Sequence, residues 1–391
     1  MTVPAPATVY LDHAATTPVR PEVVDAVAEV MRTVTGNPTG GHHVARRARD
    51  LVEDARDRVA AALGAAPAEI VFCSGGTEAD DLAVHGVVAA RGGRPACTAV
   101  EHPAVLEAVE AVGGVVVPVE PSGLVDPERL VGAIDADTPL VSVMAVNNEV
   151  GVVQPVAEVA RLLAEAAPGA ILHSDAVQAA AWLDLAPVVE AAHLVSISAH
   201  KFGGPQGIGA LVVREGVEIA ARHLGGGQER GRRSGTHDVA GIVGMVVALE
   251  AAVAERRSLA PGIAALRDRL LDGLAVLPGA TLPGGSARSE GRLAPHVATV
   301  AFDGLAGEEL LYLLDREGIA ASGGSSCSSG ALQVPHTLEA MGIPRSTAAG
   351  AVRFSLGRTT TAADVDHVLT VLPGIVDHLT AAVPSVSRRS A

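Results

Sequence analysis

The sequence almost lacks lysine. Lys201 is the single lysine among 391 residues, beside 28 arginines. Arginine stays protonated at any workable pH, so it replaces lysine as a surface cation but not as an amine that attacks a carbonyl. Lysine forms Schiff bases once its site lowers its pKa. Lys201 is therefore either a surface residue kept by chance or a reactive amine, and its surroundings decide between the two.

Other scarcities exclude several classes of protein. Aromatic residues make up 2% of a chain that is 48% hydrophobic, so Val, Leu, Ile and Ala must fill the core. Cys73, Cys97 and Cys327 form no CxxC pair and no zinc spacing, so we expect no metal site and free thiols in a reducing cytoplasm. The longest apolar stretch, residues 241–254, contains Glu250 and is too short for a membrane span.

The net charge and the first ten residues limit which partners and which location are expected for the protein. The formal net charge is −15, which argues against nucleic acid as the main binding partner. Residues 1–10 have neither the basic segment nor the apolar segment of a signal peptide. We therefore expect a cytoplasmic protein that binds neither membranes nor nucleic acid directly.

Strand and helix patterns alternate along the first two thirds of the chain. Short apolar runs lie at residues 69–73, 114–120, 140–146, 170–173, 194–199 and 209–213. Helical patterns separate most of them, which predicts an α/β fold with a mostly parallel sheet and helices on both faces. We assign residues 15–255 to this large domain, and residues 1–14 and 256–391 to a smaller α+β domain.

Three local expectations accompany this fold. Residues 21–33 and 46–63 have helical periodicity, and the arginines of the second helix are expected to face solvent. Residues 286–295 are rich in Gly, Ser and Arg and are expected to form a loop.

Lys201 comes just past the C-terminal end of the strand predicted at residues 194–199. Ligands of open α/β sheets bind outside the carboxyl ends of the strands. Gly203 and Gly204 follow and permit a tight turn and a close approach of the backbone to a ligand. Lys201 therefore stands where a covalent cofactor anchor is expected.

A glycine-rich turn follows the strand at residues 69–73. Gly75, Gly76 and Thr77 lie between this strand and a predicted helix. The N-terminus of a helix binds phosphate through its free N–H groups and its dipole, and glycines permit close approach. The same pattern also occurs as a plain turn, so it indicates a phosphate site only together with other residues.

Polar residues follow several other predicted strands. Asp175 comes just after the strand predicted at 170–173. One helix and one strand separate it from Lys201, so the two residues are expected at neighbouring strand ends. A carboxylate there can pair with the protonated ring nitrogen of pyridoxal phosphate (PLP), while the alternative is a helix N-cap. His102 and Asn148 follow further apolar runs and are expected at the same edge.

Cys327 lies in an unusual segment. Eight of the nine residues 322–330 are Ser or Gly, so the segment has little to bury and is predicted to be a mobile surface loop. A cysteine on such a loop suits a nucleophile that travels. Cys73 and Cys97 are interpreted as ordinary small apolar residues.

In their order along the chain, these motifs resemble those of the cysteine desulfurases of the class V aminotransferase group, the NifS/IscS-like PLP enzymes. The matching motifs are LDHAATTP at 11–18, GNP at 36–38, SGGTE at 74–78, EH at 101–102, NNEVG at 147–151, SDAVQ at 174–178, SAHK at 198–201, RSGT at 233–236, the Cys327 segment and RFSLG at 353–357. The resemblance implies the type I fold of PLP-dependent transferases, with a small domain built from both ends of the chain.

The resemblance also implies a role for each residue toward PLP. Lys201 would hold the cofactor covalently and move protons, Asp175 would hold the pyridinium, and Gln178 would bind the phenolic oxygen. His102 would stack on the ring and assist proton transfer. The phosphate would be bound by a set drawn from two subunits of a homodimer: Gly76, Thr77, Ser198 and His200, joined by Thr236 of the other copy.

The substrate and the reaction follow from the same resemblance. Asn148 and Arg353 would bind the carboxylate of L-cysteine, Arg353 through a bidentate pair. Cys327 would accept the sulfur as a persulfide, leaving L-alanine, and would pass the sulfur to an acceptor protein.

The sequence departs from the family pattern at a few positions. Asp81 stands where the family usually has Asn, and it weakens PLP binding if it points inward but has no such effect if it faces outward. Ala45 stands near a usual Gly, and the segment after Cys327 is unusually rich in Ser. A narrower resemblance, to the desulfurase of the DNA phosphorothioation system, leaves that pathway and iron–sulfur cluster assembly both open.

Two other functions are compatible with parts of this pattern. A PLP aminotransferase or β-lyase would use Lys201 without a persulfide on Cys327. A non-catalytic interaction protein would keep the fold and bind no cofactor covalently.

Overall fold

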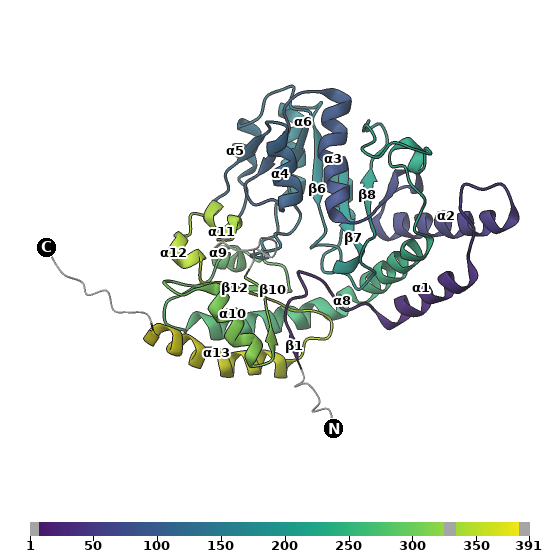
Figure 1. The fold of residues 1–391 in the computed structure, drawn as a ribbon. Helices are drawn as coiled ribbons and strands as arrows, with labels where there is room; N and C mark the ends of the chain where they lie inside the picture. The colour runs from purple at the N-terminus through teal and green to yellow at the C-terminus, as the bar shows by residue number, and fades with distance from the viewer. Residues whose placement is uncertain (1–7, 324–333, 383–391) are drawn as a thin grey trace.

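A seven-stranded sheet organises the larger part of the protein. The structure is a computed structural model that describes residues 8–323 and 334–382, so Cys327 lies outside the described residues (Figure 1). The strands run in the spatial order β2, β8, β7, β6, β5, β3, β4. Their bounds are β2 Ile70–Cys73, β3 Ala96–Thr98, β4 Val115–Val117, β5 Leu140–Ser142, β6 Ile171–Asp175, β7 Leu194–Ser198 and β8 Gly209–Val213.

The sheet is mixed but mostly parallel. Strands β7, β6, β5, β3 and β4 pair in parallel, whereas β8 is antiparallel to both of its neighbours, β7 and β2. The carboxyl ends of β3, β5, β6 and β7 therefore meet at one edge. This confirms the predicted fold class and places the polar strand ends side by side.

Helices cover both faces of the sheet, because alternate strand residues point to opposite sides. Val71 and Cys73 belong to a core cluster under α3 Gly76–Arg91 and α4 Pro103–Ala111. Ile70 and Phe72 belong to the main cluster on the other face. That face is covered by α2 His43–Leu63, α6 Val156–Ala166, α7 Ala186–Ala191 and part of α8 Val239–Ala275, while α1 Pro21–Thr33 and α5 Pro127–Gly132 add to its rim.

A second core lies beside the large sheet. It packs around the antiparallel sheet β12-β10-β9 and the parallel pair β1-β11. These strands are β1 Val9–Tyr10, β9 Ala280–Thr281, β10 Val297–Phe302, β11 Ile319–Ala320 and β12 Ala351–Ser355. Helices α10 Gly307–Arg316 and α13 Ala362–Ala382 cover them. The short helices α11 His336–Ala340 and α12 Arg345–Ala348 contribute Leu338 and Ala348 to the main cluster instead.

Helix α8 joins the two cores. Its first half, with Met245 and Leu249, packs in the main cluster, and its last turns, with Leu270 and Leu274, pack in the second. The helix runs without a break through residues 255 and 256, so the predicted domain boundary falls inside one helix. The division into domains at that point stays a prediction.

Two local expectations need correction. Arg56 on α2 is buried, not solvated: its guanidinium pairs with the buried Glu229, 2.9 Å away, and lies over the Phe72 ring. Sequence periodicity gave no hint of this partner 173 positions away. Residues 286–295 are also not entirely a loop, since the short helix α9 Gly285–Ser289 includes the first part of this range.

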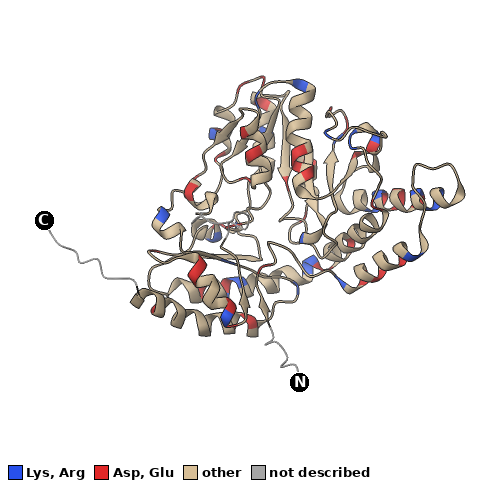
Figure 2. Cartoon of the chain, viewed as in Figure 1, with Lys and Arg blue, Asp and Glu red and all other residues tan. Residues whose placement is uncertain are grey.

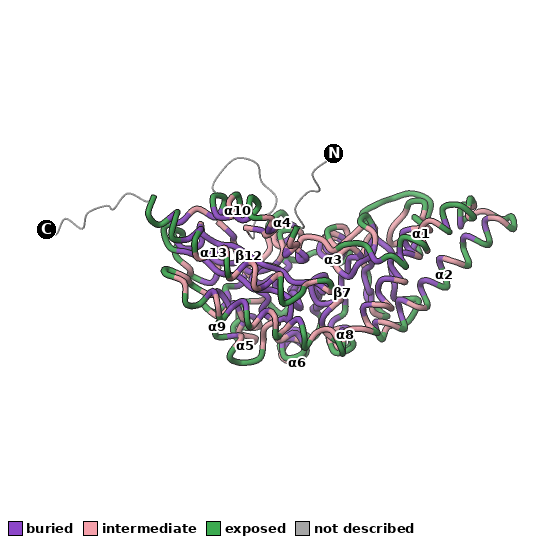
Figure 3. The backbone as a smooth tube through the Cα atoms, turned by 90° about the horizontal axis from the view of Figure 1, so that it is seen from below, coloured by how far each residue is buried: buried purple, intermediate pink, exposed green. Residues whose placement is uncertain are grey.

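The surface agrees with a mixed, acidic composition. Helix α2 carries both acidic and basic residues, whereas α1 is mostly acidic (Figure 2). The sheet strands form the buried interior, while the outer helices carry the exposed residues (Figure 3). Among the helices of the described residues, none has the length and apolar content needed to cross a bilayer.

Candidate active site

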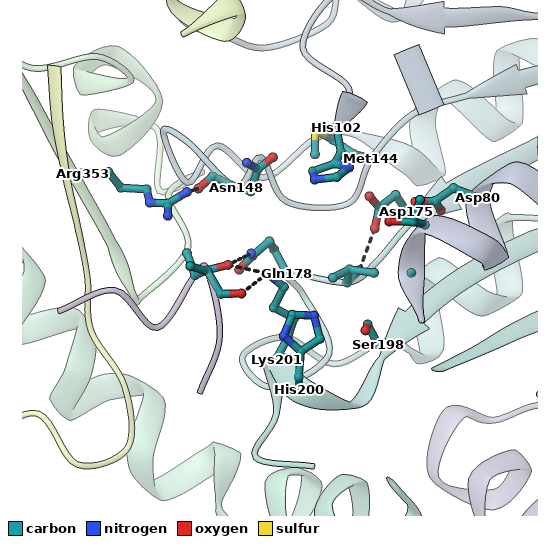
Figure 4. A pocket seen from close by; sticks show the side chains of 15 residues that line it. Asp80, His102, Met144, Asn148, Asp175, Gln178, Ser198, His200, Lys201 and Arg353 are labelled. Atoms are coloured by element: carbon teal, nitrogen blue, oxygen red, sulfur yellow. Dashed lines mark hydrogen bonds between the residues drawn. The ribbon is translucent and has the colours of Figure 1, made fainter. Parts of the chain in front are cut away.

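A cavity of about 300 Å³ opens at the carboxyl edge of the large sheet (Figure 4). Ten of the twelve predicted site residues line it: Gly76, Thr77, His102, Asn148, Asp175, Gln178, Ser198, His200, Lys201 and Arg353. They come from loops and element ends that are far apart in sequence. The parallel strands bring them together, as expected from the strand ends.

Lys201 ends a short 3₁₀ turn, Ala199–Lys201, that directly follows β7. Gly203 then turns the chain with φ +86°, where a Cβ would lie 2.7 Å from the Arg20 side chain. The Lys201 amine donates to the carbonyl oxygens of Ala14 and Ala15, 2.6 and 2.7 Å away. Burial, with the Arg353 charge adding to it, lowers the pKa of Lys201 to about 8. About a tenth of the amine is therefore unprotonated at pH 7, far more than for a free lysine with a pKa of about 10.4.

Asp175 is the last residue of β6 and is buried. One of its oxygens accepts from the Val177 N–H at 2.8 Å. Burial raises the pKa of Asp175, while the charges of His102 and Lys201 oppose this rise. A buried carboxyl with one short hydrogen bond favours a cationic partner, and a protonated ring nitrogen supplies one.

The N-terminus of α3 forms one wall of the cavity. Gly76 approaches so closely that a Cβ on it would lie 2.8 Å from Val177, which explains glycine at this position. Thr77 lies in the first turn, where N–H groups are free to bind an anion. Ser198 and His200 face the same space, and burial lowers the pKa of His200 to about 4, so it stays neutral.

His102 and Gln178 are held in fixed orientations. The Nδ1 atom of His102 accepts from the Ala104 N–H at the start of α4, so a proton on the neutral ring sits on Nε2. Burial, with Lys201 adding to it, lowers the pKa of His102. The Gln178 amide donates to the Ala14 oxygen at 2.7 Å and contacts the His296 ring nitrogen at 3.2 Å.

Arg353 comes from the small sheet and lies beside Asn148 at one side of the cavity (Figure 4). Its guanidinium is buried and donates to the Asn148 oxygen and to Asp12, both 2.9 Å away. The Nε atom has no hydrogen-bond partner among the described residues. Because five N–H groups are present, donors remain for a substrate carboxylate.

Two of the residues singled out from the sequence, Thr236 and Asp81, lie away from the cavity, and Cys327 is outside the described residues. Thr236 is exposed and does not line the cavity of its own chain. Cys327, with the mobility predicted for its loop, lies outside the described residues. Asp81 faces away from the cavity, where it pairs with Arg222 at 2.9 Å and with His85 at 3.0 Å. The outward alternative for Asp81 is therefore correct.

The sequence alone missed several lining residues. Asp80, one position from Asp81, is buried and lines the cavity, as do Met144 and Val177. Ala14 and Ala15 contribute backbone oxygens, which no side-chain pattern reveals, although both lie in a motif that the resemblance had matched. Helical periodicity on α3 is the one signal that separates an inward Asp80 from an outward Asp81.

The comparisons with known proteins agree with this geometry. The aminotransferase class V family matches residues 9–368. An IscS-like cysteine desulfurase of Mycobacterium tuberculosis is 44% identical over 382 residues, covering 94% of this chain and 96% of that protein. This chain belongs to the class V aminotransferase family, among the IscS-like cysteine desulfurases.

Solved structures of the desulfurase family share the fold along most of the chain. A NifS-like protein superposes with a TM-score of 0.87 at 37% identity, covering 95% of this chain and all of the other. DndA from Streptomyces lividans gives a TM-score of 0.72 at 36% identity, covering 88% of this chain and 99% of the other.

The cavity fits the cofactor that class V enzymes use. A lysine amine with a lowered pKa lies at one side, a buried carboxyl at another, and a helix N-terminus with a glycine that nothing larger can replace at a third. These are the groups that a carbonyl, a pyridine nitrogen and a phosphate require.

Proposed function

We propose that this chain uses PLP to convert L-cysteine to L-alanine, with the sulfur taken by Cys327 and passed to an acceptor protein. One observation carries the proposal: Lys201, Asp175 and Arg353 line a single cavity, which joins a cofactor anchor to a carboxylate clamp. The near full-length similarity to cysteine desulfurases supports the choice of substrate.

The residues divide the work toward PLP. When bound, the cofactor supplies an electron sink that stabilises a carbanion on the substrate. Lys201 anchors it covalently, Asp175 keeps a negative charge at the ring-nitrogen end, and Gln178 and His102 orient the ring. Gly76, Thr77, Ser198 and His200 bind the phosphate through N–H and side-chain groups at the start of α3 and the end of β7.

Other residues of the cavity bind the substrate and transfer protons. Arg353 and Asn148 hold the L-cysteine carboxylate, so that the substrate lies between them and Lys201. With its pKa lowered to about 8, the Lys201 amine accepts and returns a proton near neutral pH. His102 offers a proton on Nε2 from the side, because its Nδ1 is occupied by the Ala104 N–H.

Both ends of the segment that carries Cys327 are attached beside the cavity. Ser322 exchanges two backbone hydrogen bonds with Arg353, of 3.1 and 2.7 Å. On the other side, the His336 ring donates to the Glu101 oxygen at 2.8 Å, next to His102. These attachments support a role for Cys327 at this site, since the chain enters and leaves its segment at the cavity rim.

The sulfur step balances without an added oxidant. The Cys327 thiolate attacks the substrate sulfur, a sulfur–sulfur bond forms, and the carbon–sulfur bond breaks. The electron pair of that bond and a proton remain with the carbon skeleton as L-alanine, and Cys327 carries the persulfide. An acceptor protein then takes the outer sulfur by thiolate exchange.

Further parts of the proposal concern assembly and pathway. A homodimer explains the exposed Thr236, which would complete the phosphate site of the second copy. We place the enzyme in the cytoplasm, with a sulfur-acceptor protein rather than DNA as its partner. The acceptor serves iron–sulfur cluster assembly or DNA phosphorothioation. The structural similarity to DndA is the reason for including the second pathway.

The substitution Cys327→Ala tests the persulfide. The variant should bind PLP with unchanged absorbance and lose alanine formation from cysteine in the absence of added thiol. Cys97→Ala is the matched control, because that thiol is buried and outside the cavity, and it should retain activity. Alanine release by Cys327→Ala at the wild-type rate would instead support a β-lyase or aminotransferase.

A further inference from the structure

A chain of five buried polar side chains runs from the wall of the cavity, at Asp80, along the face of the sheet that α3 covers. It consists of Glu101 after β3, Ser142 on β5, His173 on β6, Ser196 on β7 and Asp80 on α3. Parallel pairing sets Ser142 directly opposite His173 and Ser196 opposite Asp175. None of the roles proposed above uses these five residues.

The contacts run from one strand to the next. The Ser142 hydroxyl lies 2.8 Å from His173 Nδ1, and the Ser196 hydroxyl lies 3.0 Å from His173 Nε2. The Asp80 carboxyl is 3.5 Å from the same Nε2 atom. The Ser142 hydroxyl also stabilises the charged form of Glu101, and the Ser196 hydroxyl that of Asp80. The two acids are thus joined through one imidazole.

The His173 imidazole is neutral, so the chain of hydrogen bonds has two possible arrangements, one for each tautomer of the ring. His173 is fully buried, and burial lowers its pKa to about 3. A neutral imidazole donates from one nitrogen and accepts at the other. If Nε2 carries the proton, Ser196 accepts from it and turns its own hydrogen toward Asp80. If Nδ1 carries the proton, Ser142 accepts and turns its hydrogen toward Glu101.

Both acids are short of partners. Within residues 8–323 and 334–382, the buried Asp80 Oδ1 and Glu101 Oε2 atoms find no hydrogen-bond partner, whereas Thr98 and the Met144 N–H donate to the other Glu101 oxygen at 2.7 and 2.9 Å. Burial raises the pKa of Asp80, and it raises that of Glu101 to about 7. The negative charge of Asp175 adds to both rises. Three buried carboxyls whose charges raise one another's pKa values do not all ionise.

We propose that Glu101, Ser142, His173, Ser196 and Asp80 form a proton-sharing relay, in which Asp80 and Glu101 together carry one negative charge and the tautomer of His173 decides which of them is ionised. The step moves protons only. The protonated acid gives its proton to the adjacent serine, and that serine gives its own proton to the ring. The ring gives its other proton to the second serine, which passes its own proton to the ionised acid, so the charge moves and every serine and the ring stay neutral. Asp80 and Glu101 are positioning residues that act through Asp175.

The relay has a consequence for the cavity. The charged groups that face the relay are Asp175 and, across the cavity, His102 and Lys201. The shared charge stays near Asp175 whichever acid holds it. The ring-nitrogen end of the cavity therefore keeps a constant negative potential while protons move along the relay. This reading rests on the proposed PLP site, whereas the relay itself does not.

A double-substitution cycle tests the shared charge. The visible absorbance of the Lys201-bound cofactor is titrated against pH in Asp80→Asn, Glu101→Gln and the double variant. Each single variant leaves the one negative charge on the remaining acid. The midpoint of the absorbance titration should therefore move by less than about 0.3 pH unit. The double variant loses the charge, which disfavours the protonated cationic form, and its midpoint should fall by about 1 unit.

The controls separate sharing from other effects. Ser174→Ala removes a buried hydroxyl from the same strand that makes no contact with the relay, and it should leave the midpoint unchanged. Additive shifts in the cycle, or no shift in the double variant, would overturn the proposal. Absence of any PLP absorbance in the wild-type protein would count against the proposed function and not against the relay.

The tautomer of His173 provides a second readout that needs no cofactor. In histidine-¹⁵N-labelled protein, Asp80→Asn should place the ring proton on Nδ1, because the charge then lies on Glu101. Glu101→Gln should place it on Nε2. His173→Gln identifies the signal by its loss. The same tautomer in both variants would contradict the relay.

Discussion

The two walls of the cavity are built differently. The wall at the ring-nitrogen end is formed by β6, β7 and α3, and its polar groups, such as Asp175 and Ser198, are buried on regular elements. The opposite wall joins two cores: Arg353 belongs to β12 of the small sheet, while Asn148 lies in a loop after β5. The segment with Cys327 leaves from beside Arg353.

This difference separates two kinds of chemistry. Rigid strand ends suit a cofactor whose position must stay fixed through the reaction. A junction between two cores suits a substrate that enters and a product that leaves. The first wall therefore specifies a PLP enzyme, and the second specifies what that enzyme does with L-cysteine.

The largest expected effect is at the ring-nitrogen wall. Asp175→Asn keeps an oxygen for the Val177 N–H but removes the charge, so the chain should still fold and bind PLP. Breaking a buried charge pair costs about 3–5 kcal/mol, which corresponds to a loss of about a thousandfold in kcat. Steady-state alanine formation measures this loss.

Asp81→Asn is the matched control for that prediction. It makes the same chemical change on the outer side of α3, where Asp81 pairs with Arg222 on the surface. Its activity should stay within about twofold of wild type, because exposed ion pairs contribute at most about 1 kcal/mol. Equal losses in the two variants would contradict the assignment of Asp175.

The next effect is at the substrate wall. Arg353→Gln removes the charge-assisted donors for the L-cysteine carboxylate, and kcat/KM should fall about 100-fold, mainly through KM. PLP should still bind in full amount, since Arg353 lies opposite the ring-nitrogen wall. Arg345→Gln, which breaks an exposed pair with Glu339, is the control and should have no effect. A fall in kcat with unchanged KM would remove Arg353 from substrate binding.

The sequence predicted the first wall better than the second. Apolar runs identified β6 and β7, and parallel pairing then required Asp175 and Lys201 to meet at one edge. Asp80 was missed, because an aspartate near a helix start resembles a solvated residue until the face of α3 is known. Arg56 was misplaced for a related reason: its partner Glu229 is distant in sequence, and only tertiary packing brings the two charges together.

The smallest effect is a pH dependence that links the two walls. Burial and Arg353 lower the pKa of Lys201 to about 8, while Asp175 and Asp12 oppose them. The amine is therefore charged below about pH 8 and neutral above it. Because the chain has one lysine, protein labelled with ¹³C at lysine Cε gives a single signal from this side chain.

That signal should titrate with a midpoint near 8 in the cofactor-free protein. Asp12→Asn should move the midpoint lower, because it removes a charge that favours the ammonium form. A wild-type midpoint near that of free lysine, about 10.4, would show an amine that the site does not activate.

The division of labour between Lys201 and Cys327 is tested most directly by mapping both residues in one sample. The protein is incubated with PLP and L-cysteine, one portion is reduced with borohydride, and peptides of both portions are analysed by mass spectrometry. We predict a stoichiometric pyridoxyl adduct on the peptide with Lys201, and one additional sulfur, removable by a thiol reductant, on the peptide with Cys327. An adduct confined to the terminal amine, or added sulfur on Cys73 or Cys97, would contradict this account.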